Sequence, residues 1–289
     1  MRGTQLQRRR PPRRLVRRFL AHRPAVASLV VLTIVVVAAF AVPLVWQYSY
    51  ADITPDSSVP PSLDHPFGTD NLGHDAFAQV LRGIQRSLEI SVLVALVSGL
   101  VGTVWGSLAG YYGGRVDSLL MRTCDLVLTL PLLAVAAVLA NATSGSWWLV
   151  ALVLSALSWA LIARVVRGVV LSVREKEFIE AARALGSTDL RIIATHVVPN
   201  VVGPVTVTVT ILLSTAILAE TALSYLGFGV QAPDVSLGLL VSASSTAVST
   251  RPWLFYFPGL FIIVIALAVN FIGDGLREAL DPKQNRVRR

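Results

Sequence analysis

Long apolar runs alternate with shorter polar segments along the whole chain. Six of the runs carry few or no charges, and each approaches the roughly 20 residues that a helix needs to cross a bilayer. The pattern therefore predicts an all-α, polytopic membrane protein with six transmembrane helices. The expected spans are residues 25–46, 90–114, 119–140, 147–163, 201–222 and 252–273.

The composition supports a membrane protein over a soluble one. Of the 289 residues, 54% are hydrophobic and only 15% are charged, and the mean hydropathy is +0.66. A soluble domain would be about one quarter charged. The single cysteine, Cys124, excludes an intrachain disulfide and is expected to be a buried packing residue. In the second span, Gly102, Gly106 and Gly110 share one helix face, which predicts close approach of a neighbouring helix.

The net charge of +8 follows membrane topology, so it does not indicate nucleic-acid binding. Of the 25 Lys and Arg residues, 22 fall on one side of the expected spans, which the positive-inside rule identifies as cytoplasmic together with both termini. The basic segments 1–24 and 283–289 then lie in the cytoplasm, 1–24 beside anionic headgroups. Residues 47–85 form a turn-rich external loop, and 86–282 hold the other five spans. The run 25–46 is longer than the core of a cleaved signal peptide, which favours a transmembrane span over a signal peptide. The remaining three of the 25 Lys and Arg residues, which fall on the external side, are Arg82, Arg86 and Arg251.

One polar segment between two apolar runs contains a regular pattern. It reads EAARALGSTDLRIIATHVVP from Glu180 to Pro199. We expect a helix from Glu175 to Leu185, a break at Gly186, and a second helix that is capped by Ser187, has Asp189 in its first turn and is closed by Pro199. A helix-turn-helix in the longest cytoplasmic loop of a membrane protein is typical of a docking element for a soluble partner.

This segment, within about residues 170–200, resembles the EAA loop of permease subunits in ABC importers. Five positions match the family pattern in register. His196 and Val198 stand where the general pattern has Ile and Leu, and His is common at the first position in the peptide-importer branch. The resemblance implies a type I ABC importer permease fold and an ATPase-coupling loop. The residues assigned to this loop are Glu180, Ala181, Ala182, Gly186, Asp189, Arg191 and Pro199.

Three further stretches resemble the C-type permease subunits of dipeptide and oligopeptide importers. They are His65–Leu88, Ala219–Gly229 and the C-terminal stretch Asn270–Pro282. The resemblance implies a bacterial inner-membrane protein that forms half of a translocation path for oligopeptides or dipeptides. It also implies four partners: a homologous second permease, two cytoplasmic ATP-binding subunits that carry ATP and magnesium, and an external peptide-binding protein. Importers of nickel, glutathione or another small peptide-like solute belong to the same branch and stay open as alternatives.

The sequence gives little indication of an enzyme or of a cofactor bound by this chain. It has no Gly-Lys-Ser/Thr phosphate-binding loop, no Gly-x-Ser-x-Gly nucleophile turn and no histidine cluster that suggests a metal site. An ionisable group within a span is a functional candidate by default. Glu220, near the external end of the fifth span, is therefore a candidate gate or path residue, and we expect it to face the second permease or the external gate. A secondary transporter that uses Glu220 as its proton site is the alternative from another class.

Overall fold

The computed structural model describes residues 12–141 and 145–280, and their regular structure is helical. Two isolated β-bridges, Ile53–His74 and Thr69–Asp75, are the only strand-like pairings in these ranges. The helices are α1 (Pro12–Ala21), α2 (Arg23–Ala41), η1 (Val42–Leu44), α3 (Ala76–Tyr112), α4 (Gly114–Thr129), α5 (Leu132–Asn141), α6 (Trp147–Arg174), α7 (Glu177–Ala184), α8 (Asp189–Ile192), η2 (Ile193–Val197), α9 (Val198–Tyr225), α10 (Leu237–Ser244), η3 (Ser245–Ala247) and α11 (Pro252–Leu280).

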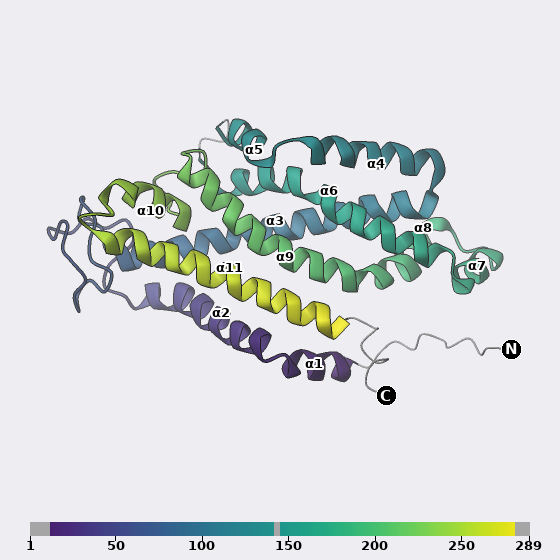
Figure 1. The fold of residues 1–289 in the computed structure, drawn as a ribbon, viewed down its shortest axis with the longest axis horizontal. Helices are drawn as coiled ribbons and strands as arrows, with labels where there is room; N and C mark the ends of the chain where they lie inside the picture. Colours follow the sequence, from purple (N-terminus) through teal and green to yellow (C-terminus); the bar gives the residue numbers. More distant parts are fainter. Residues whose placement is uncertain (1–11, 142–144, 281–289) are drawn as a thin grey trace.

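The helices form one elongated bundle with two different ends (Figure 1). One end carries α1, α7, α8 and the last turn of α11, and we call it the α7 end. The opposite end carries α5, α10 and the folded segment 45–75, and we call it the α10 end. Five single helices or helix runs are long and apolar enough to cross a membrane, and the bent pair α4–α5 makes a sixth if it is counted as one span.

The third span differs from the straight helix expected over residues 119–140. Its two parts, α4 and α5, are bent by 84° relative to each other. The break falls at Leu130, whose backbone is extended (φ −73°, ψ 135°), directly before Pro131. Proline disfavours the helical conformation in the residue before it and lacks the amide hydrogen that would continue the helix. The sequence pattern located this span correctly but did not resolve its break.

Helix α4 nevertheless runs antiparallel to α6, and α5 packs beside the start of α6. Residues progressively later in α4 and α5 associate with residues progressively earlier in α6. Asp117 bonds to Arg167, Cys124 shares a buried cluster with Ala160 and Ala163, and Ala136 shares one with Val150 and Ala151. The chain therefore returns from the α7 end to the α10 end before α6 begins, as the alternation of six spans requires.

The α3–α6 contact depends on the predicted glycine face. A Cβ atom built on Gly102 would lie 2.7 Å from the Cβ of Ile162, and one on Gly110 would lie 2.7 Å from the Cβ of Val170. Both distances are shorter than real side chains allow. The predicted close approach is confirmed, and α6 is the neighbouring helix.

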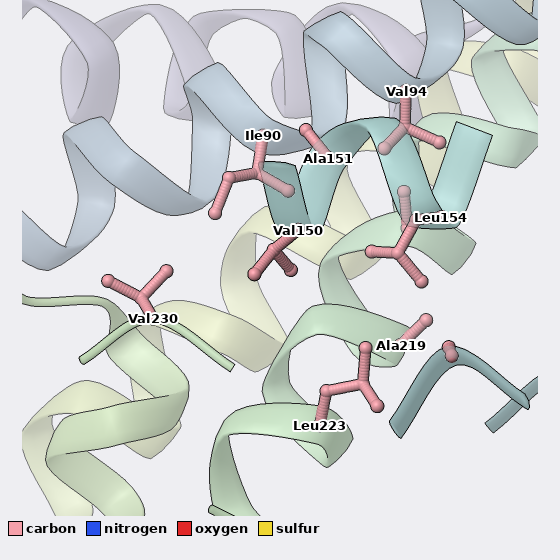
Figure 2. Packing of buried hydrophobic residues seen from close by; sticks show 10 residues of the cluster. Ile90, Val94, Val150, Ala151, Leu154, Ala219, Leu223 and Val230 are labelled. Atoms are coloured by element: carbon pink, nitrogen blue, oxygen red, sulfur yellow. The ribbon is translucent and has the colours of Figure 1, made fainter. Parts of the chain in front are cut away.

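A buried apolar cluster joins α3, α6 and α9 towards the α10 end (Figure 2). Its members are mostly β-branched residues and leucines that are almost fully enclosed. Val230, from the segment that follows α9, belongs to the same cluster. The labelled residues are Ile90, Val94, Val150, Ala151, Leu154, Ala219, Leu223 and Val230.

The second span is longer than the sequence pattern indicated. Helix α3 begins at Ala76, so the expected external loop 47–85 contains the first ten residues of this helix. Asp75 caps it by accepting a hydrogen bond from the backbone amide of Ala78 at 2.7 Å. The buried His65 ring holds the other Asp75 carboxylate oxygen at 2.7 Å. These contacts fix the segment 45–75 on the α10 end as a folded layer.

Candidate functional site

The coupling loop, residues 175–199, lies at the α7 end of the bundle (Figure 1). Helix α7 begins two residues later than the expected Glu175 and ends one residue before Leu185. Gly186 follows with φ +76°, in the left-handed region where glycine is strongly favoured. The amide of Gly186 donates to the carbonyl of Arg183, and that of Ser187 donates to the carbonyl of Ala182. These two bonds form a Schellman motif, so the predicted break at Gly186 has the expected local cause.

The second helix of the loop differs from the prediction at both of its ends. Thr188, and not Ser187, occupies the capping position, and its side chain makes no capping hydrogen bond. Pro199 does not close the helix either. Helix α8 continues through the π-helical turn η2 into α9, and Pro199 lies at the start of α9. Proline is tolerated in the first turn of a helix because the amide groups there need no intrahelical partner.

Apolar side chains on the inner face fix the coupling loop to the bundle. Ile179 and Ile192 are fully buried in a cluster with Val166 and Val170 of α6. At the end of α3, the Tyr111 hydroxyl donates to Asp189 Oδ1 at 2.7 Å. The guanidinium of Arg183 lies over the ring of Tyr111, 5.1 Å from its centroid. The loop is therefore attached to α3 and α6 as well as to α9.

The outer face of the loop is exposed and carries two large apolar side chains. Leu185 is 86% exposed and Leu190 is 72% exposed. Most of the sequence-predicted residues share this exposure, whereas Ala182 is buried on the inner face. The exposed ones are Glu180, Ala181, Gly186, Asp189, Arg191 and Pro199. Exposed leucines beside charged groups are suited to contact with a protein partner.

Glu220 lies far from this loop, near the α10 end of α9, and is fully buried. Its carboxylate accepts hydrogen bonds from Ser224 Oγ at 2.7 Å and from Ser87 Oγ of α3 at 3.1 Å. Ser236, which caps α10, lies 3.3 Å from Ser224. One carboxylate thus joins α3, α9 and the start of α10.

That Glu220 faces the second permease or the external gate stays a prediction, and within this chain its side chain is fully buried. The serine hydroxyls of three elements of the same chain enclose it. A carboxylate buried in an apolar bundle requires such donors, because an unpaired buried charge or polar group is costly. The sequence identified the residue as unusual, but its partners are separated from it by up to 133 residues.

The sequence did not reveal a second polar cluster beside Glu220. Asp234 binds Arg82 Nε at 3.0 Å and Arg86 Nε at 2.5 Å. These two arginines are exceptions to the charge bias, and their four-residue spacing places them on one face of α3. No local pattern pointed to Asp234, which follows α9. Among the described residues, no three His, Cys, Asp or Glu side chains are grouped as metal ligands would be.

Comparison with known proteins decides the family. Residues 102–286 match the family described as binding-protein-dependent transport system inner membrane component. The chain belongs to this family. Residues 11–61 also match the N-terminal transmembrane domain of oligopeptide transport permease C. The protein is therefore a membrane-embedded transport permease, and the family favours this class over a secondary transporter.

Several permeases are similar to this chain over nearly its whole length. It is 43% identical to the oligopeptide transport system permease protein OppC of Mycobacterium tuberculosis, over 95% of this chain and 96% of the relative. It is 36% identical to OppC of Bacillus subtilis, over 92% and 88%. It is 37% identical to the dipeptide transport system permease protein DppC of Bacillus subtilis, over 93% and 85%.

A solved structure supports the fold at lower sequence similarity. A chain of the MetNI methionine ABC transporter superposes with a TM-score of 0.55 and 15% identity, covering 71% of this chain and 97% of that chain. The helical architecture is accordingly that of an ABC importer permease, as the sequence resemblance implied.

We predict that Glu220→Leu destabilises the protein more than Glu220→Gln. Leucine leaves the buried hydroxyls of Ser87 and Ser224 without their acceptor, which costs about 1–3 kcal/mol, whereas glutamine keeps one acceptor oxygen. Thermal unfolding of the purified chain in detergent measures the difference. Ser87→Ala should cost less in the Glu220→Leu background than in the wild type, because the bond is already lost. An unchanged unfolding temperature for Glu220→Leu would contradict this role.

Proposed function

We propose that this permease is a subunit of an ATP-driven importer and forms half of the translocation path for oligopeptides or dipeptides. The similarity to oligopeptide permeases over 95% of the chain is the observation that carries the substrate proposal. We propose a second permease, two cytoplasmic ATP-binding subunits and an external peptide-binding protein as partners. ATP and magnesium belong to the ATP-binding subunits in this assignment.

The coupling loop is the proposed contact with one ATP-binding subunit. The exposed Leu185 and Leu190 would enter an apolar recess on that subunit, and the charged groups around them would set the orientation. Two rigid connections lead away from the loop. Tyr111 joins it to α3 through Asp189, and α8 continues through η2 into α9. A displacement of the loop would thus move two membrane-spanning helices.

Glu220 is the proposed joint at the other end of these two helices. It lies on α9 and accepts a hydrogen bond from Ser87 on α3, beside the start of α10. A relative movement of α3 and α9 would therefore displace α10 through this carboxylate. In this proposal Glu220 affects an external gate by holding α10, without lining the path itself.

Charge distribution supports a cytoplasmic position for the α7 end and for both termini. Arg82 and Arg86 bond to Asp234, and Arg251 donates to Ser58, so the three basic exceptions lie at the α10 end. The coupling loop lies at the opposite end, with the side of the chain that holds most of the Lys and Arg residues. The positive-inside rule then orients the bundle in a bacterial cell membrane.

Uptake of labelled peptides by a strain that lacks this subunit tests the substrate. We expect loss of uptake for peptides of two to five residues and recovery when the chain is restored on a plasmid. Measuring each length separately distinguishes a dipeptide importer from an oligopeptide importer, and parallel assays with nickel and glutathione test the alternatives. Normal peptide uptake with loss of nickel or glutathione uptake would replace the peptide assignment.

Gly186→Val should weaken co-purification of the ATP-binding subunit and abolish transport while membrane insertion is retained. A Cβ atom at Gly186 would meet no neighbouring atom within 4 Å, so the substitution destabilises the turn through its backbone conformation and not through a steric clash. A β-branched residue in the left-handed region costs roughly 1–2 kcal/mol or more. Gly186→Asn is the matched control because asparagine tolerates this conformation. Normal recovery of the ATP-binding subunit with Gly186→Val would refute the docking role.

Cysteine labelling tests the orientation. In a Cys124→Ala background, Leu63→Cys should react with an impermeant maleimide in intact cells, because Leu63 is 98% exposed at the α10 end. Leu185→Cys, in cells that express this chain alone, should react only after permeabilisation. Cys124 itself is fully buried, so alanine is a conservative background. The opposite labelling pattern would invert the proposed topology.

A further inference from the structure

Two adjoining grooves lie at the α7 end, where α1, α9 and α11 meet. The first has a volume of about 470 Å³ and is lined almost entirely by apolar side chains. The second has a volume of about 620 Å³, shares Gly203 and Leu280 with the first, and includes Arg277. We call the first one the α1 groove. Its lining includes Val16, Phe19, Val202, Thr206, Leu276 and Leu280.

Two exposed arginines lie next to lining residues of the α1 groove. Arg277 lines the adjoining second groove, and Arg17 follows the lining residue Val16 on α1. Within residues 12–141 and 145–280, neither guanidinium has a carboxylate within ion-pair distance. Of the two carboxylates in the last turns of α11, Glu278 is 3.6 Å from His22, and Asp274 makes no ion pair among the same residues. In the part of the chain that the structure describes, two arginines without an ion-pair partner therefore lie next to residues that line an apolar recess.

Helix α1 has the features of a helix that lies at the membrane surface. Residues 1–24 contain nine arginines and no acidic residue. Val16 and Leu20 of α1 are 58% and 59% exposed, one turn apart, while Phe19 packs against α11, where a Cβ atom at Gly275 would lie 3.2 Å from its ring. Exposed apolar residues with arginines on the same short helix are typical of interfacial binding to anionic lipid.

We propose that the α1 groove binds an anionic phospholipid, with one acyl chain in the groove and the phosphate group at Arg17 and Arg277. The position fits this ligand because the groove is formed by the terminal turns of α9 and α11, at the level where a membrane helix meets the headgroups. The apolar lining matches an acyl chain, and the guanidinium groups, which have no ion pair among the described residues, match a lipid with net negative charge. This site concerns the lipid environment of the chain and does not depend on which solute is transported.

Retention of lipid by the purified full-length chain tests the proposal. The chain is exchanged into detergent with equal amounts of phosphatidylglycerol and phosphatidylcholine of identical acyl chains, and bound lipid is counted by native mass spectrometry. We expect retention to favour phosphatidylglycerol by roughly tenfold or more, since each arginine near an anionic lipid contributes about fivefold in affinity. Equal retention of the two lipids would overturn the proposal.

Variants locate the site. Gly203→Leu should fill the groove, because a Cβ atom there would meet only Leu280, at 3.7 Å, and it should abolish preferential retention. Gly168→Leu, on open surface of α6, is its control. The double variant Arg17→Gln, Arg277→Gln should also lose the preference. Its control, Arg115→Gln with Arg122→Gln, removes the same charge from exposed positions of α4 and should retain the preference.

Three outcomes contradict the assignment, provided that all variants elute as monodisperse protein. Wild-type retention by Gly203→Leu would show that the lipid binds elsewhere. Equal losses in both arginine pairs would show that only overall charge matters. If Gly203→Leu releases the second permease from the assembled importer and leaves lipid retention unchanged, the α1 groove is a subunit interface and not a lipid site.

Discussion

The close contact between α3 and α6 is the constraint on which the rest of the structure depends. In a bilayer the apolar side chains gain little by leaving the lipid, so helices associate through close packing and polar contacts. Gly102 and Gly110 allow α3 to approach Ile162 and Val170 without intervening side chains. This contact fixes the two ends of α3. Tyr111 then lies beside the coupling loop, and Ser87 lies beside Glu220.

Two long helices therefore connect the coupling loop with the surroundings of Glu220. Tyr111 and Ser87 lie on α3, roughly 36 Å apart along its axis. Asp189 and Glu220 lie on the helical run that begins with α8 and continues through η2 into α9. Because each helix has a polar contact with the other near both ends, a displacement at the coupling loop can be transmitted without a chain of side-chain rearrangements. The π-helical turn η2 interrupts the α-helical pattern on this path, and such turns are frequent at functional sites.

The two ends of the bundle use polar groups differently. At the α10 end, Glu220 and Asp75 are buried, and each has its hydrogen-bond donors within the chain. At the α7 end, Leu185 and Leu190 of the coupling loop and the two arginines next to the α1 groove are exposed. The first arrangement holds elements of one chain together. The second presents apolar and charged groups to surroundings that the chain does not provide itself, a protein for the loop and lipid for the groove in our proposals.

The sequence by itself determined the helical class, the approximate position of every span, the glycine face of α3 and the turn at Gly186. These features depend on local hydrophobicity and on conformations that single residues favour, so they are readable from neighbouring positions. Only the tertiary structure decided where Glu220 points, which carboxylate compensates Arg82 and Arg86, and that Pro199 begins α9 instead of ending a helix. Each of these depends on residues that are distant in the chain or on the helix that follows. The energy of a buried polar group is set by the partners that folding brings to it, and no local pattern specifies them.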